Sequence, residues 1–136
     1  MTYEEKKAYL SRYWEATHEL MGLVQEFERW MNVAVGGAIS FSDAKTGGSS
    51  AKSRIEYAIA NKVDIEAMIR EDMQKAARIR AEVKQIIDQV PKERQRAALK
   101  LHYIGFMSWE NVADTLGIST QAAHGLHRRA LEGMDI

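Results

Sequence analysis

The sequence predicts an all-α protein in which a long antiparallel helical hairpin is followed by a C-terminal three-helix helix-turn-helix domain. Apolar residues recur at three- and four-residue steps through most of the 136 residues, which is the period of an amphipathic helix. Proline occurs once and 46% of the residues are hydrophobic, as in a folded, mainly helical protein. Glycine and serine concentrate in one stretch, residues 35–53, which divides the N-terminal part in two.

The first predicted helix covers residues 2 to about 34. Thr2 together with Glu4 and Glu5 makes a fitting start for this helix. An apolar stripe follows the helical period, and it must be buried against another surface. We interpret it as core rather than as a small-molecule pocket. Its members are Leu10, Tyr13, Thr17, Leu20, Val24, Phe27 and Met31, broadened by Trp14, Met21 and Trp30.

Residues 35–53 are expected to form a flexible loop, because they contain two Gly-Gly pairs and five serines. The segment 46–53 weakly resembles a phosphate-binding loop. It lacks the glycine that should precede Lys52, and no apolar strand leads into it, so nucleotide binding is not predicted.

A second long helix is predicted over residues 54–89, with Ser53 as its cap. At 1.5 Å per residue this helix would be roughly 54 Å long. An apolar stripe along such a helix is longer than a single compact domain can cover. We therefore assign residues 1–90 to a hairpin for oligomerisation or interaction, forming a homodimer through the long helices; a monomeric hairpin folded on its own C-terminal domain is the alternative. The stripe has a heptad-like spacing and comprises Ala58, Ile65, Ile69, Ala76, Ile79, Val83, Ile86 and Val90.

Residues 91–136 are expected to form the helix-turn-helix domain. Pro91 should open its first helix, since proline suits the first helical position, and Gly105 should end it. Ser108 is placed to cap a short second helix. Gly117 can adopt the positive φ of a sharp turn, and Ser119 can cap the last helix.

The last helix, residues 119–132, has a small apolar face and an opposite face of polar and basic residues. Such a helix suits the major groove of DNA, which is about 12 Å wide. A solvated face on a helical bundle is the alternative interpretation. The predicted DNA-binding residues are Ser119, Thr120, Gln121, His124, His127, Arg128 and Arg129.

The run from residue 87 to 134 resembles region four of the primary and extracytoplasmic sigma factors. The resemblance rests on Val90-Pro91, Ser108-Trp109-Glu110, Val112-Ala113, Leu116-Gly117-Ile118-Ser119 and Arg129-Ala130-Leu131. It implies a fold that reads a promoter element and also contacts RNA polymerase. The architecture is also similar to that of the ArpU-like regulators of late transcription in phages, which implies a phage or prophage origin.

Charge and composition limit the function further. Net charge is zero, with 19 basic and 19 acidic residues, and residues 91–136 carry 6 basic and 5 acidic groups. Phosphate neutralisation by a monomer must therefore be modest. The absence of cysteine excludes disulfides and thiolate metal sites. No apolar run reaches the length of a membrane span and no signal peptide is apparent, so a cytoplasmic location is expected.

Neither an enzyme nor a metal or cofactor site is predicted. Glu15 and His18 have the spacing of one half of a di-metal site, but the second long helix has no histidine. His102, His124 and His127 could meet at a metal, yet no carboxylate pattern completes that site. No arrangement of a nucleophile with a base, or of paired carboxylates, is apparent.

Three functions are compatible with these features of the sequence. The first, which we favour, is a DNA-binding transcriptional regulator. The second is a module that binds RNA polymerase or a sigma factor, because Thr120, Gln121 and Ala122 stand where the sigma family often has arginine or glutamate. The third is a DNA-packaging component whose long helices assemble into a ring.

Overall fold

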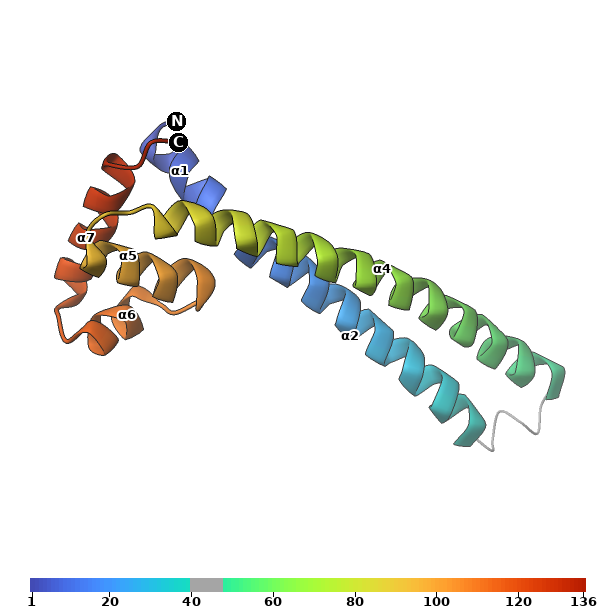
Figure 1. Cartoon of the computed structure of the whole chain (residues 1–136). Coiled ribbons are helices and arrows are strands. Elements are labelled where there is room, and N and C mark those ends of the chain that lie inside the picture. Colours follow the sequence, from blue (N-terminus) through green and yellow to red (C-terminus); the bar gives the residue numbers. More distant parts are fainter. Residues whose placement is uncertain (40–47) are drawn as a thin grey trace. The chain divides into compact units, whose positions relative to one another are not determined.

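The computed structural model describes the backbone of residues 1–39 and 48–136, and the side chains of residues 1–33 and 52–136. Every regular element within these ranges is helical, which confirms the all-α class (Figure 1). None of the helices in the described part of the chain is long and apolar enough to cross a membrane. The elements are α1 (Tyr3–Leu10), α2 (Arg12–Ile39), α4 (Gly48–Asp88), α5 (Glu93–Leu99), the π-helical η1 (Lys100–Ile104), α6 (Trp109–Leu116) and α7 (Thr120–Glu132).

The chain divides into two compact units. The first combines Met1–Thr17 with Lys75–Ile136, and the second is His18–Gln74. This division differs from the boundary at residue 90 that the sequence predicted. The physical reason is a shared core in the first unit, where the side chain of Leu10 is fully buried. That core contains Leu10, Val83, Ile87, Val90, Leu99, Tyr103, Ala130 and Leu131.

Helix α1 is a separate short helix, although one continuous helix was predicted from residue 2 to about 34. Its start is a capping box: the Thr2 hydroxyl accepts from the Glu5 amide and the Glu5 carboxylate accepts from the Thr2 amide. Ser11 ends it, and its hydroxyl donates to the Lys7 carbonyl at 2.8 Å, a local bond that bends helices.

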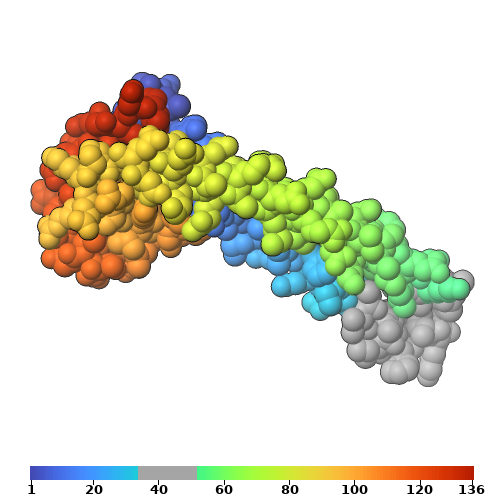
Figure 2. All heavy atoms as spheres, viewed as in Figure 1, coloured from blue at the N-terminus to red at the C-terminus, as the bar shows by residue number. Residues whose placement is uncertain are grey.

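The end of helix α7 is held by α1. The Lys6 ammonium donates to the carbonyls of Leu131 and Met134, at 2.8 Å each. These carbonyls lie at the negative end of α7, so the charge of Lys6 is well placed. Figure 2 shows the first residues (blue) against the last residues (red) within this unit.

The connection between α4 and α6 departs from the predicted single helix. Pro91 precedes the helix instead of opening it, because α5 begins at Glu93, and the chain widens to π-helix from Lys100 to Ile104. Gly105 ends the segment as predicted; a Cβ there would stand 2.7 Å from the Leu101 carbonyl oxygen.

Helices α6 and α7 are joined by the short turn that the sequence predicted. The Ser108 hydroxyl accepts from the Asn111 amide, and the Ser119 hydroxyl accepts from the Ala122 amide at 3.0 Å. Gly117 has φ 68° and ψ 35°, the left-handed conformation that glycine adopts without strain. A second buried cluster fixes α5, α6 and α7 to one another, and consists of Ala98, Val112, Ala113 and Ala123.

The second unit consists of parts of α2 and α4. The rings of Trp30 and Tyr57 lie 5.6 Å apart, and the Lys62 ammonium lies 5.8 Å from the ring of Phe27, so the two helices are antiparallel there. Both helices extend into the predicted loop 35–53, since α2 reaches Ile39 and α4 begins at Gly48. The middle of that loop, residues 40–47, lies outside the described residues.

Candidate nucleic-acid interface

The outer face of α7 is the candidate interface. Its inner side packs on α5 and α6 through Ala123, Ala130 and Leu131, which are buried. Because those contacts fix the rotation of the helix about its axis, most of the remaining polar residues are turned toward the outer side. Six of the seven predicted DNA-binding residues are exposed there: Ser119, Thr120, Gln121, His124, Arg128 and Arg129.

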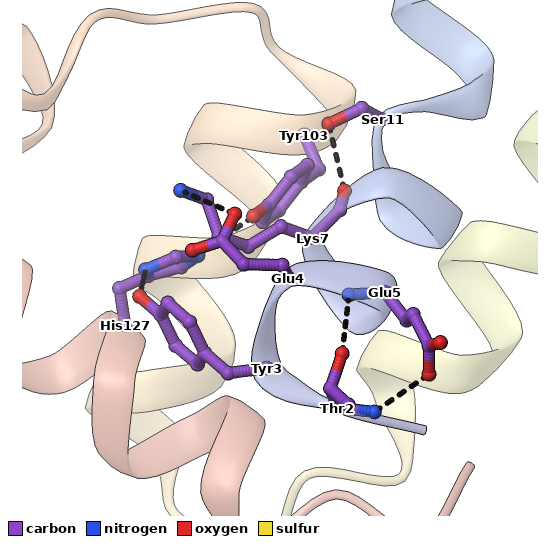
Figure 3. Close-up of polar contacts among 8 residues, drawn as sticks. All are labelled: Thr2, Tyr3, Glu4, Glu5, Lys7, Ser11, Tyr103 and His127. Atoms are coloured by element: carbon purple, nitrogen blue, oxygen red, sulfur yellow. Dashed lines mark hydrogen bonds and ion pairs between the residues drawn. The ribbon is translucent and has the colours of Figure 1, made fainter.

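The seventh residue, His127, was wrongly placed on the exposed face. Its side chain is only 3% exposed and its ring lies between two tyrosines (Figure 3). Nδ1 lies 3.0 Å from the hydroxyl of Tyr3, and Nε2 lies 2.6 Å from the hydroxyl of Tyr103. Since both ring nitrogens have partners inside the protein, His127 is a core residue and not a DNA contact.

Burial of this group changes its acid–base chemistry. Desolvation, with smaller contributions from the nearby charges of His102 and Lys7, lowers the pKa of His127 to about 4. Burial also raises the pKa of Tyr103 above its ordinary value. At neutral pH both groups are therefore uncharged, and they form a neutral hydrogen-bonded chain from α1 through α7 to η1.

Aromatic rings pack against α7 near His124 and His127. The ring of His102 stacks on Trp109 at 4.1 Å, and Trp109 lies 4.6 Å from His127 and 5.5 Å from His124. His102 Nδ1 lies 2.8 Å from the Met107 carbonyl, so this nitrogen carries the proton and donates. The three histidines thus meet in a packed aromatic cluster. Within the described residues, no three His, Asp or Glu side chains converge as metal ligands would.

Two of the exposed residues also have structural roles. Ser119 uses its hydroxyl to cap α7. The Arg129 guanidinium lies along its own helix, where Nη1 is 3.4 Å from the position that a Cβ on Gly125 would take. The described hydrogen bonds give no structural role to the other four exposed side chains, which are those of Thr120, Gln121, His124 and Arg128.

Sequence reasoning missed one residue of this surface, Tyr3. It lines a notch of about 490 Å³ together with Gln121, His124, Gly125, Arg128 and Arg129 of α7. No spacing in the sequence links residue 3 to a helix that begins at residue 120. Only the docking of α1 on α7, through Lys6 and Tyr3, brings them together.

Comparison with known proteins identifies a family of undetermined function. The family model described as "Protein of unknown function (DUF1492)" matches residues 38–135, which include all of α4 to α7 but not α1. No curated protein and no solved structure matches the chain. Because the family model covers more than half of the sequence, the chain belongs to the DUF1492 family.

Proposed function

We propose that this protein is a DNA-binding transcriptional regulator of phage or prophage origin that acts in the cytoplasm and inserts α7, with its cap Ser119, into the major groove of double-stranded DNA. The observation that carries the proposal is the exposed polar and basic side of α7, set up by the left-handed turn at Gly117. An α-helix with its side chains is about 10–12 Å across and fits a groove about 12 Å wide.

The arrangement supporting this proposal is a helix-turn-helix. Helix α6 begins at a serine cap, ends at a left-handed glycine and is followed after one apolar residue, Ile118, by the capped helix α7. Ile118 is only partly exposed and packs with Leu126 against the cluster under α7. This is the same segment in which the sequence resembles sigma region four, where the second helix of the pair reads DNA.

The exposed residues divide into two chemical roles. Thr120, Gln121 and His124 lie on the first turns of α7 and have side chains that can meet base edges; a glutamine can bond adenine in two places. Arg128 and Arg129 follow further along and suit phosphates, which position a protein but do not specify sequence.

Because the net charge of the chain is zero, strong binding to DNA phosphates requires a second copy of the chain. One chain offers few phosphate contacts, whereas a symmetric dimer doubles them and places two α7 helices on two half-sites. The second unit has exposed apolar side chains suited to such a contact: Val63 is 54% exposed and Met68 is 50% exposed. We therefore include in the proposal a long hairpin of α2 and α4 that dimerises.

A selection experiment tests the proposal. The full chain is incubated with a pool of random duplexes, bound DNA is recovered and sequenced over several rounds, and Gln121→Ala is run in parallel. We expect one motif to be enriched and Gln121→Ala to lose preference at one base pair, by about 1–3 kcal/mol. A pool that stays random for wild type would refute sequence-specific DNA reading.

A second function is favoured by the balanced charge of residues 91–136. A region-four-like domain that does not attract DNA strongly could bind RNA polymerase or a sigma factor as its main partner. Retention of purified polymerase on the immobilised chain after nuclease treatment would support this function. Loss of the polymerase with the DNA would count against it.

A further inference from the structure

Contacts between α7 and the base edges of DNA do not explain why α1 and α7 together form a notch. Five of its six lining residues come from the outer side of α7, and Tyr3 comes from α1, more than a hundred residues away in the chain. None of the six carries a carboxylate, and two carry guanidinium groups, Arg128 and Arg129. Glu4, which follows Tyr3 in the chain, has the Lys7 ammonium 3.7 Å from its carboxylate (Figure 3).

The hydrogen bonds of His127 to Tyr3 and Tyr103 determine whether the Tyr3 hydroxyl can donate to a ligand in the notch. A neutral histidine donates from one ring nitrogen and accepts at the other. Tyr103 is buried and its hydroxyl has Nε2 of His127 as its partner, so the hydroxyl proton is satisfied only if Nε2 accepts. We therefore assign the proton of His127 to Nδ1, which donates to the oxygen of Tyr3. The hydroxyl proton of Tyr3 remains available to a ligand.

Gly125 provides room in the same place. It lies in the interior of a 13-residue helix, where glycine is less stable than alanine by about 1 kcal/mol. Its backbone is an ordinary helical one, so no positive φ calls for glycine there. A side chain at this position would project into the notch beside the Arg129 guanidinium, and its absence leaves the backbone open to close approach.

We propose that this notch binds a phosphate group and that the backbone of bound DNA supplies it; this rests on the proposed function. The guanidinium of Arg128 and the hydroxyl of Tyr3 donate to the phosphate oxygens across the opening left by Gly125. Hydrogen bonds to a charged group are about twice as strong as neutral ones, which favours an anion at this point. Helix α1 is then part of the DNA interface and sets its register on the duplex.

Scanning with neutral phosphates tests the proposal. Single methylphosphonate linkages are placed along an enriched duplex and affinity is measured for wild type and Tyr3→Phe. We expect one linkage at which wild type loses about tenfold in affinity. Tyr3→Phe should lose about tenfold on the unmodified duplex and little more at that linkage, because the two changes remove the same bond.

A pair of glycine variants controls for stability. Gly125→Ala should raise the melting temperature, since its new methyl group meets only the flexible end of Arg129, and should lower DNA affinity several-fold by filling the notch. Gly22→Ala in α2 has no atom within 4 Å of the new methyl group. It should raise the melting temperature similarly and leave affinity unchanged.

The outcomes separate the two proposals. If DNA binds normally to Tyr3→Phe and Gly125→Ala, the phosphate site is refuted and DNA reading stands. If no duplex binds to wild type, DNA reading fails, and the site is tested with inorganic phosphate at constant ionic strength. Saturable shifts of the Gly125 and Arg128 amide resonances that Gly125→Ala abolishes would then identify a site for free phosphate. No shift would refute the site as well.

Discussion

Replacing Leu10 with alanine tests whether the N-terminal segment is part of the compact unit that contains α7. The side chain is fully buried and packs with Val83, Leu99 and Leu131. Burial of a leucine contributes about 1.5–3 kcal/mol, and the cavity left by truncation adds to the loss. We therefore expect Leu10→Ala to lower the free energy of unfolding by about 3 kcal/mol. In a unit of this size, that lowers the melting temperature by roughly 10–20 °C.

The assay is urea unfolding followed by circular dichroism, combined with hydrogen exchange of the α7 amides. Met21→Ala is the matched control, because Met21 is 53% exposed and its truncation should change stability by less than about 0.5 kcal/mol. In Leu10→Ala, exchange in α7 should become faster along with the loss of global stability. If Leu10→Ala behaves like Met21→Ala, then residues 1–17 do not belong to the unit that contains α7.

Three further predictions concern the turn, the buried histidine and the long helices. Gly117→Ala should destabilise the protein by about 1–2 kcal/mol in thermal unfolding, because alanine is strained at φ 68°, whereas an unchanged melting temperature would contradict the turn geometry. The pKa of His127 is about 4 when folded and 6.5 when unfolded, so the free energy of unfolding is highest above pH 6.5 and falls by about 3 kcal/mol as the pH is lowered to 4. A His127→Gln variant should show a flatter profile in acid titrations, and identical profiles would refute this cause. Met68→Glu should shift the sedimentation coefficient from dimer to monomer, and a monomeric wild type would remove the dimer from the proposal.

Local signals explain why the α6 to α7 turn could be predicted from sequence. Ser108, Gly117 and Ser119 act within four residues of their own position, through a cap bond or a left-handed backbone, so their partners are visible in the sequence. The heptad-like stripe of α4 was also predictable, because the period of a helix is visible in the sequence. Ala58 and Ile65 are buried as expected.

Long-range contacts explain what the sequence could not provide. His127 follows Ala123 by four positions and precedes Leu131 by four, so its place in the helix points inward, but its polarity suggested an exposed face. Its partners, Tyr3 and Tyr103, come from other elements, and neither pairing has a sequence signal. The same limit applies to α1, whose docking on α7 created both the mixed unit and the notch.

The most direct test of the central claim is the salt dependence of duplex binding, measured for wild type, Arg128→Ala and Arg70→Ala. Both arginines are exposed, but Arg70 lies on α4, away from α7 in the sequence. If α7 contacts DNA, Arg128→Ala should weaken binding to all duplexes and reduce the slope of log K against log salt by about 1. Arg70→Ala should keep the wild-type slope. Equal slopes for all three proteins, or no binding at low salt, would contradict DNA binding through this face of α7.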